Sequence, residues 1–413
     1  MHHKPMFRMA TLLLGLAAAQ SQAGGLWVGE YNQPTMGRAG AGEETGSGDA
    51  TDAFFNAASM SQHEESQFMA AVGGIWATAE FDVDSGSIVN GTGDGGDAGG
   101  GTPSASVFWS RPLNDRWSIG MSGAALTGAV LDYDNDWVGR FETTEVSVLV
   151  IGFIPAVSYK VSDKLSLGLS VPMMYSELEL DIAVPAAISP TEGEGKLSLD
   201  GDDMQAAVTG SFLYQFNDKT RLGARVSSNF QFDYDGDIKT AQGLGVGAST
   251  EITFSSIARV GLTHDFNEQW SGHVTWGWDN WSEMGDVLLS TDSKGVTLSR
   301  NWQDTYHYAI GADYRLDKRW TLRAGMAYDT SPTDEHDRTA DMPMDEQYRF
   351  AIGADYLRDS GMRVSGSLVY ADYGDAEIDN SANQPVLGFA GDYGTNEIWF
   401  ASLSFNWPMG VTR

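Results

Sequence analysis

Strict alternation of apolar residues with small or polar ones is the feature that most constrains this chain. Residues 399–407 read WFASLSFNW and residues 270–278 read WSGHVTWGW, so every second side chain belongs to an apolar set. A period of two places that set on one face of a β-strand. Beyond residue 23 the longest apolar stretch, Val146 to Val157, is shorter than the ~20 residues that a membrane-spanning helix requires. The chain is therefore expected to fold from strands.

The apolar face of these segments has its aromatic residues at the ends. Residues 302–314 and 320–329 repeat the pattern, with Trp and Tyr flanking aliphatic residues and a small or polar opposite face. Strands that face lipid between two aromatic girdles have this pattern. A soluble β-sandwich or propeller is the alternative, but it would turn these Trp and Tyr residues toward water. A barrel also closes its own edges, as a bilayer demands, so we predict an all-β transmembrane barrel.

Six short polar turns give the number of strands. They begin at positions 114, 162, 217, 267, 317 and 358, between 41 and 55 residues apart, and each separates two alternating segments. Each interval holds two strands and one longer loop, and short turns at one end with long loops at the other are typical of outer-membrane barrels. Six turns join twelve strands. One strand before them (about Gln67 to Val83) and one after them (about Thr395 to Trp407) predict a 14-stranded antiparallel barrel.

Composition excludes several classes of function. The chain has no cysteine, which excludes disulfides, cysteine nucleophiles and cysteine-ligated metals. With 56 acidic and 25 basic residues, its net charge of -31 argues against nucleic acid as a partner. We predict no metal site and no cofactor.

The N-terminus predicts a secretory signal followed by a separate segment. Lys4 and Arg8 precede a short apolar run, and the small-residue site Ser21-Gln22-Ala23 follows it. Residues 1–23 are therefore expected to be a cleaved signal peptide. Residues 24–65 do not alternate, and a barrel of 14 strands is wider than side chains alone can fill. We predict that residues 24–65 plug the lumen and that residues 66–413 form the barrel.

The centre of the plug segment carries a family resemblance. Residues 49–60 read DATDAFFNAASM. Together with DWVGRF at 136–141, IPAVSYK at 154–160 and WTLRAGMAYD at 320–329, this stretch resembles the long-chain fatty acid transporter (FadL) family of outer-membrane barrels, over essentially the whole chain after the signal. One departure is Asn56-Ala57-Ala58, where the family has Asn-Pro-Ala, so this turn lacks the proline that would fix it.

The resemblance implies a bacterial outer-membrane channel for passive uptake of hydrophobic molecules, foremost long-chain fatty acids. Substrate would bind among the extracellular loops and then against the plug, whose gate residues would be Phe54, Phe55, Asn56, Ala57 and Ala58. Aromatic or other neutral hydrocarbons are the alternative substrates. Partners would be these small molecules and the surrounding lipid and lipopolysaccharide, and the protein would be a monomer.

The resemblance also implies lateral exit through a gap at a kinked third strand. That strand runs here from about Trp117 to Leu131 and contains Gly120, Gly123 and Gly128. Glycine tolerates the distorted backbone of a bulge or kink. Equally, these glycines could allow close packing against the plug.

Strand parity places several arginines in the lumen. Residues opposite the apolar face point inward, and these include Arg225, Arg259 and Arg323. With Arg140 of the 136–141 motif, they are the candidates for binding a substrate carboxylate, to which a guanidinium is suited. The alternative is a set of wall ion pairs with lumen aspartates such as Asp313 and Asp355.

Two other functions fit the sequence less well. An outer-membrane lipase needs a Ser and a His at the lipid surface, but His273 and His307 have lumen parity and no Gly-x-Ser-x-Gly motif accompanies a suitable histidine. A porin for polar solutes needs an open channel, against which the plug argues. We therefore expect a transport protein and not an enzyme.

Overall fold

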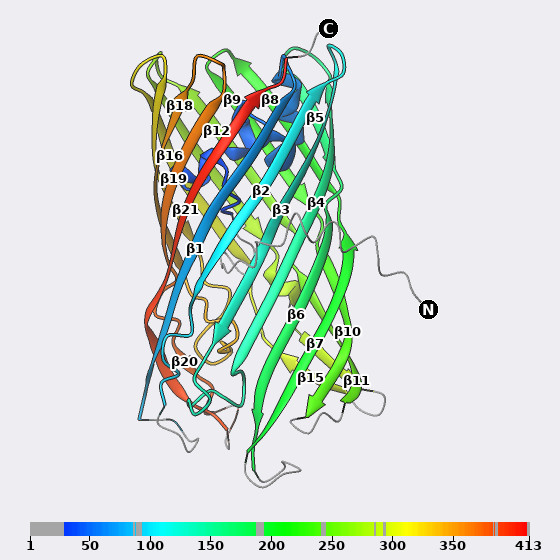
Figure 1. Cartoon of the computed structure of the whole chain (residues 1–413), viewed down its shortest axis with the longest axis vertical. Coiled ribbons are helices and arrows are strands. Elements are labelled where there is room, and N and C mark those ends of the chain that lie inside the picture. Colours follow the sequence, from blue (N-terminus) through cyan, green and yellow to red (C-terminus); the bar gives the residue numbers. More distant parts are fainter. Residues whose placement is uncertain are drawn as a thin grey trace.

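The computed structural model describes residues 29–85, 87, 93–186, 194–240, 245–284, 286–291, 295–382, 384 and 387–410. The predicted signal peptide lies outside these residues. Within them, the strands form one closed antiparallel sheet that crosses the barrel wall fourteen times, which confirms the predicted 14-stranded barrel (Figure 1). We call each crossing a stave, because some crossings consist of two shorter strands placed end to end. Among the described residues, no helix is both long and apolar enough to cross a membrane.

Eight staves are single strands and six consist of two strands each. The single strands are β1 (Gln67–Val83), β2 (Gly101–Pro112), β3 (Trp117–Asp132), β4 (Glu145–Lys160), β17 (Trp320–Asp329), β18 (Gln347–Leu357), β19 (Arg363–Asp372) and β21 (Ala390–Pro408). The two-part staves are β5 (Leu165–Ser170) with β6 (Met173–Val184), β7 (Gly195–Ala206) with β8 (Thr209–Asn217), β9 (Thr220–Ser227) with β10 (Phe230–Thr240), β11 (Gly245–Phe254) with β12 (Ile257–Asp265), β13 (Trp270–Asp279) with β14 (Asp286–Thr291), and β15 (Gly295–Ser299) with β16 (Thr305–Arg315). A short β20 (Ile378–Asp379) pairs with β21.

The barrel is closed by the pairing of its first and last strands. β1 pairs with β21 from Gln67 opposite Pro408 to Val83 opposite Gly391, with one register shift between Glu80 and Phe81. This closure removes the exposed edges that hydrocarbon would not tolerate.

The six predicted turns are confirmed, and all lie at one end of the barrel, at the top of Figure 1. Three of them are held by the same pattern of side-chain-to-backbone hydrogen bonds. The side-chain oxygen of Asn114, Asn267 or Asp317 accepts hydrogen bonds from the backbone N–H groups two and three residues later, at 2.7–3.0 Å. Such side chains stabilise tight turns locally. By the short-turn rule this end is periplasmic and the opposite end is extracellular.

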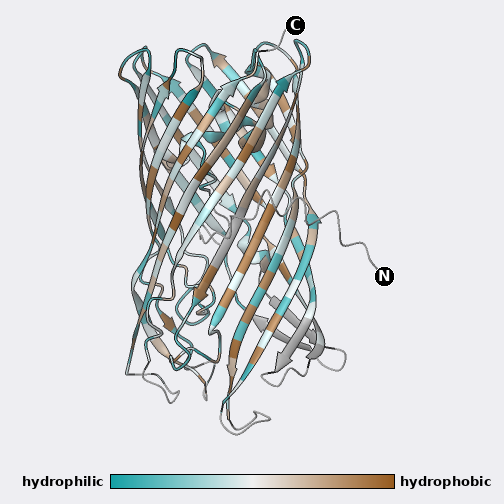
Figure 2. Ribbon diagram, viewed as in Figure 1, coloured by the Kyte–Doolittle hydropathy of each residue, from teal (hydrophilic) through white to brown (hydrophobic). Residues whose placement is uncertain are grey.

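Aromatic pairs mark the membrane boundary next to the short turns. Trp117 packs against Tyr159, Trp270 against Tyr314 and Trp320 against Tyr356, with tilted rings whose centroids lie 4.6, 4.6 and 4.8 Å apart. Between such pairs and the tyrosines farther along the strands, the outer face is apolar. Hydrophobic and hydrophilic residues alternate along the strands that are coloured in Figure 2. The predicted lipid-facing parity is thereby confirmed.

Residues 30–66 pack inside the barrel, as predicted for a plug (Figure 1, dark blue). They form the short helices η1 (Pro34–Arg38), η2 (Glu43–Thr45), α2 (Asp52–Phe55) and η3 (Ala57–Gln62), and η4 (Trp281–Met284) lies between β13 and β14. The plug lies nearer the periplasmic end.

A band of lumen-facing glycines receives the plug. A Cβ atom at any of them would lie only 1.6–2.8 Å from a plug atom, so any larger residue would collide with the plug. We call these residues the glycine band: Gly73, Gly120, Gly168, Gly223, Gly261, Gly311, Gly325 and Gly353. The closest approach is at Gly223, where the Cβ would lie 1.6 Å from the carbonyl oxygen of Glu44.

Candidate functional site

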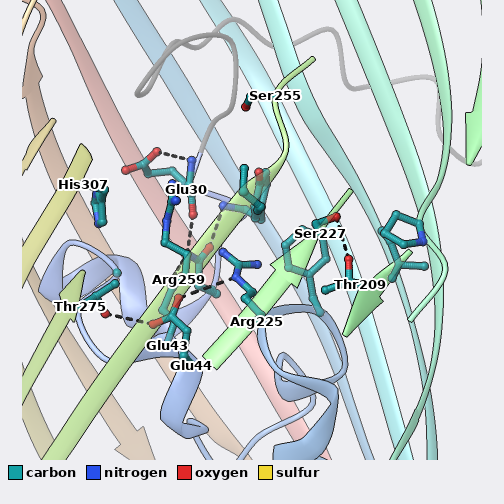
Figure 3. Close-up of a pocket in the computed structure, with 18 of the residues that line it drawn as sticks. Glu30, Glu43, Glu44, Thr209, Arg225, Ser227, Ser255, Arg259, Thr275 and His307 are labelled. Carbon is teal, nitrogen blue, oxygen red and sulfur yellow. Dashed lines mark hydrogen bonds and ion pairs between the residues drawn. The ribbon is translucent and has the colours of Figure 1, made fainter. Parts of the chain in front are cut away.

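A cavity of about 140 Å³ lies between the plug and the barrel wall (Figure 3). We call it the plug pocket. One part of its lining is apolar and includes Tyr31, Met36, Phe54, Ile154, Pro172, Met174, Phe230 and Ile257. The other part is charged and includes Glu30, Glu43, Glu44, Arg225, Arg259, His307, Asp329 and Arg349. Such a lining suits a ligand with an apolar body and one polar group.

Breaks in four neighbouring staves make room for this pocket. β5 and β6 are separated by Val171 and Pro172, and Pro172 has no N–H to donate to a ladder. At the next break, the Ser228 hydroxyl accepts from the Val208 N–H at 3.2 Å, while the Ser228 N–H donates to the Val208 carbonyl at 3.0 Å. Hydroxyl groups therefore satisfy backbone groups that the broken strands leave unpaired. Several of these break residues line the pocket.

The pocket arginines differ in how well they are paired. Arg259 makes a bidentate contact with Asp279, at 3.0 and 2.9 Å. Arg349 bonds Asp329 and donates to Gln347 at 2.7 Å. Both guanidinium groups are held by wall carboxylates or amides through their terminal nitrogens, although the Nε of Arg349 is buried without a hydrogen-bond partner among the described residues.

Arg225 is held more weakly. Its nearest carboxylate is that of Glu44, with Nε 3.7 Å from Oε1, which is too long for a hydrogen bond. Its Nε is buried without a hydrogen-bond partner among the described residues. Its guanidinium lies 5.5 Å from the ring of Phe55. In Figure 3 Arg225 and Glu44 face one another across the lower part of the pocket.

The structure separates the four arginines predicted to bind substrate. Arg225 and Arg259 line the plug pocket. Arg140 lies instead between β3 and β4, where it makes a bidentate contact with Glu194 at 2.9 and 2.8 Å. Arg323 bonds Asp355 and contacts the Pro34 carbonyl of the plug at 3.5 Å, and it does not line the pocket.

The predicted gate residues hold the plug in place. Phe54 lines the pocket and lies 4.8 Å from the Tyr31 ring. The Asn56 amide donates to the carbonyls of Glu44 and, at 2.9 Å, Phe212, while its oxygen accepts from the Ala58 N–H at 3.0 Å. Ala57 and Ala58 lie directly against Gly168. Side-chain bonds of Asn56 thus fix this turn without the proline of the family motif.

The predicted kink glycines have different surroundings. A Cβ at Gly120 would lie 2.5 Å from Met60 Sδ and 2.7 Å from Ala53, so this glycine is required for contact with the plug. A Cβ at Gly123 would meet only the Val107 side chain, at 3.3 Å. Gly128 follows a register shift between Ala125 and Thr127 in the pairing of β3 with β4.

The ladder between β2 and β3 is interrupted beside this shift. Its described pairings run from Pro112 opposite Ser118 to Ser106 opposite Ala124. The two segments meet again where the Asp132 N–H donates to the Ala98 carbonyl at 3.0 Å. Between these points the described residues of β2 and β3 form no backbone pairing.

Sequence reasoning missed the charged residues of the plug. Arg38 donates to Asp313 at 2.9 Å, and His63 lies between Asp52 and Ser110 at 2.8 Å from each. The charged residues within the predicted plug segment were themselves a signal, because charged side chains enclosed by the lumen must find partners there. Within the described residues, no group of three or more His, Asp or Glu side chains is arranged to hold a metal ion.

An aromatic cluster lies toward the extracellular end, where loops pack together. Tyr133 stacks on Trp137 at 4.0 Å, and its hydroxyl lies 2.6 Å from that of Tyr393. Nearby, Glu142 accepts hydrogen bonds from Asn380, Gln384 and the Ala340 N–H. These contacts tie residues 133–144, 338–342, 378–382 and 384 into what we call the loop cluster.

The loop cluster is expected to open more readily as pH rises. Removal of water around Glu142 raises its pKa from 4.5 to about 7. The closed cluster therefore binds more protons than the open one, and the free energy of opening falls as pH rises from about 4.5 to about 7. Hydrogen exchange of residues 133–144 should be faster at pH 8 than at pH 5.5 after correction for intrinsic rates. Glu142→Gln should remove this difference, and its persistence in the variant would contradict the assignment to Glu142.

Comparisons with known proteins agree with the barrel and its plug. The sequence matches the family described as "Outer membrane protein transport protein (OMPP1/FadL/TodX)" over residues 14–406. It is 24% identical over 388 residues to the "Long-chain fatty acid transport protein" of Escherichia coli O6:H1, covering 83% of this chain and 86% of the relative. It is also 24% identical over 387 residues to "Outer membrane protein P1" of Haemophilus influenzae Rd, covering 81% and 83% of the two chains.

Solved structures share the fold. The crystal structure of a Pseudomonas aeruginosa FadL homologue superposes with a TM-score of 0.86 at 23% identity, covering 93% of this chain and all of the other. The Pseudomonas putida toluene transporter TodX gives a TM-score of 0.68 at 16% identity, covering 94% and 99%. At these identities the likeness concerns the fold alone.

Proposed function

Because the chain belongs to the OMPP1/FadL/TodX family of outer-membrane transport proteins, we propose that it takes up long-chain fatty acids through the plug pocket. As a member of this family it is a bacterial outer-membrane β-barrel, a channel for hydrophobic compounds and not an enzyme. The proposal concerns the chemical class of the substrate and its route.

Arg225 is the observation that carries the fatty acid proposal. A neutral hydrocarbon cannot accept a hydrogen bond from a buried guanidinium group. Burying a charge without its full set of hydrogen bonds costs free energy. A carboxylate can bond such a guanidinium in a bidentate manner. The acyl chain would then lie along the apolar part of the lining, with Phe54 and Phe230 among its contacts.

Aromatic hydrocarbons are the second candidate, and the size of the pocket favours them. Its volume of about 140 Å³ is close to that of the ~150 Å³ engineered cavity that binds benzene. A long acyl chain would have to extend beyond it into the lumen. The relative TodX is described as a toluene transporter.

The exit that we propose is lateral, through a gap along the unpaired stretch of β2 and β3. Its β2 edge includes Gly101 and Pro103, which also line a shallow, mainly apolar groove on the outer wall together with Val72, Trp76 and Leu403. An apolar molecule leaving by this gap would reach hydrocarbon without crossing water.

Competition among three ligands tests the substrate class. Purified protein in detergent should bind oleate more tightly than methyl oleate, because only the acid gives Arg225 an anionic partner. Equilibrium binding of labelled oleate, displaced by methyl oleate or by a long-chain alkylbenzene, measures the difference. Equal displacement by all three would reject the acid and favour the hydrocarbon channel.

A further inference from the structure

Glu44 of the plug already places a carboxylate beside Arg225. Its side chain is 2% exposed, and its Oε2 accepts from the Thr275 hydroxyl at 3.0 Å. Its other oxygen, Oε1, is the one that lies 3.7 Å from Arg225 Nε. A plug carboxylate thus approaches the cation that the fatty acid proposal assigns to the substrate.

The backbone around Glu44 is one of the main attachments of the plug to the wall. The Gly42 N–H donates to the same Thr275 hydroxyl at 2.8 Å, so this hydroxyl joins two plug residues to β13. The Thr45 carbonyl accepts from Arg221 at 3.1 Å. The Glu44 carbonyl lies against Gly223 of β9 and accepts from Asn56. A shift of Glu44 would therefore disturb contacts with β9 and β13 together.

Negative charge is already crowded at this place. Glu43, next to Glu44, is buried and is bonded by Thr35 at 2.6 Å and Gln33 at 2.9 Å, both within the plug. Burial, and secondly the Glu44 charge, raise the pKa of Glu43 to about 7. A third carboxylate at Arg225 would meet strong repulsion unless one of the residents moved.

From these contacts we infer that Glu44 occupies the substrate-carboxylate position on Arg225 and that an incoming acid displaces it, which loosens the η2 segment of the plug. This inference rests on the proposed function. Acid binding and plug attachment are then linked, and each weakens the other by the same factor. A neutral hydrocarbon would leave Glu44 in place. Glu44 is thereby a residue that sets specificity as well as a coupling residue.

Glu44→Gln tests the displacement. Glutamine keeps an acceptor for Thr275 and nearly the same shape, but it removes the charge that competes for Arg225. Oleate should bind the variant about tenfold more tightly than the parent, whereas methyl oleate should bind both equally. Heat-modifiable migration in gels verifies that the variant barrel is folded.

Glu43→Gln is the matched control. Assayed at pH 8, above the raised pKa of Glu43, it removes a carboxylate charge one residue away, from a side chain bonded by Thr35 and Gln33 within the plug. A general electrostatic effect would tighten oleate binding equally in both variants. Direct displacement requires a clearly larger effect at Glu44, so equal effects, or none at Glu44, would overturn the inference.

Hydrogen exchange gives a second readout that does not depend on affinity. In the parent, saturating oleate should speed exchange of residues 42–45, whose contacts to Thr275 and Gly223 it would disturb. Methyl oleate should not, and Glu44→Gln should show no such response to oleate. Unchanged exchange in the parent at saturation would overturn the inference.

The two proposals fail in different ways. If oleate has no advantage over methyl oleate in the parent, the fatty acid function fails and the displacement fails with it. If oleate has that advantage but Glu44→Gln does not increase it, only the displacement fails.

Discussion

Replacement of Arg225 by alanine is expected to weaken oleate binding about a hundredfold or more. The substrate carboxylate would remain in a largely apolar pocket without its cation, and leaving a buried charge unpaired costs about 3–5 kcal/mol. The repulsion from Glu44, whose Oε1 is 3.7 Å from Arg225 Nε in the parent, would also no longer be offset. Equilibrium binding of labelled oleate measures the loss, and an alkylbenzene should bind the variant as it binds the parent.

Two other arginines serve as controls for this prediction. Arg140 is bonded to Glu194 in a loop, and Arg323 of β17 is bonded to Asp355 on the barrel wall beside the plug. Neither lines the plug pocket, so alanine at either position should leave oleate affinity within about threefold of the parent, once folding has been verified. Equal losses at all three positions would indicate a general effect of positive charge in the barrel. Parental affinity in Arg225→Ala would reject the carboxylate contact itself.

The barrel itself followed from the sequence because its causes are local and repeated. Each stave must present alternate residues to lipid, and each periplasmic turn is short enough to be fixed by its own side chains, as at Asn114 and Asp317. Each signal recurs about every fifty residues. A wrongly assigned strand would therefore interrupt the regular spacing of the short turns.

The pocket did not follow in the same way because its causes are not local. Parity indicated that Arg225, Arg259 and Arg323 face the lumen, but their height depends on the register summed around the barrel. The register of all the strands together determines which residues lie at the same height. It places Arg225 beside Glu44, about 180 residues earlier in the chain, and Arg323 beside Asp355. The break at Ser228 resembles an ordinary strand interior in sequence, whereas Pro172 marks a point where a central strand cannot continue unbroken.

Glycine is the residue type whose pattern in the sequence carries information about the plug. The sequence is consistent with Gly120 serving either a strand kink or plug contact, and its contact with Met60 joins it to seven other glycines that receive the plug. Glycine inside a strand marks either a bulge or the close approach of another backbone. Lumen-parity glycines on neighbouring strands are therefore the sequence signal for contact with the plug.

The plug should leave its position when the closest member of the glycine band is enlarged. At Gly223 the added Cβ would lie 1.6 Å from the Glu44 carbonyl oxygen, and the next two atoms also belong to the plug. The strand cannot retreat easily, because Gly223 is paired with Leu213 on one side and Gly261 on the other. Gly223→Val should therefore displace the η2 segment while the barrel still folds, since valine is favoured in strands.

Planar-bilayer conductance measures the result of that displacement. Gly223→Val should open large, frequent conductance steps that the parent shows rarely, because the plug would no longer fill the lumen. Gly210→Val is the matched control on β8, where a Cβ would have no atom within 4 Å, and it should behave as the parent does. Low conductance in a folded Gly223→Val barrel would mean that the plug keeps the lumen closed without its contact at η2. Closure would then have to depend on the α2 and η3 contacts to Gly120 and Gly168.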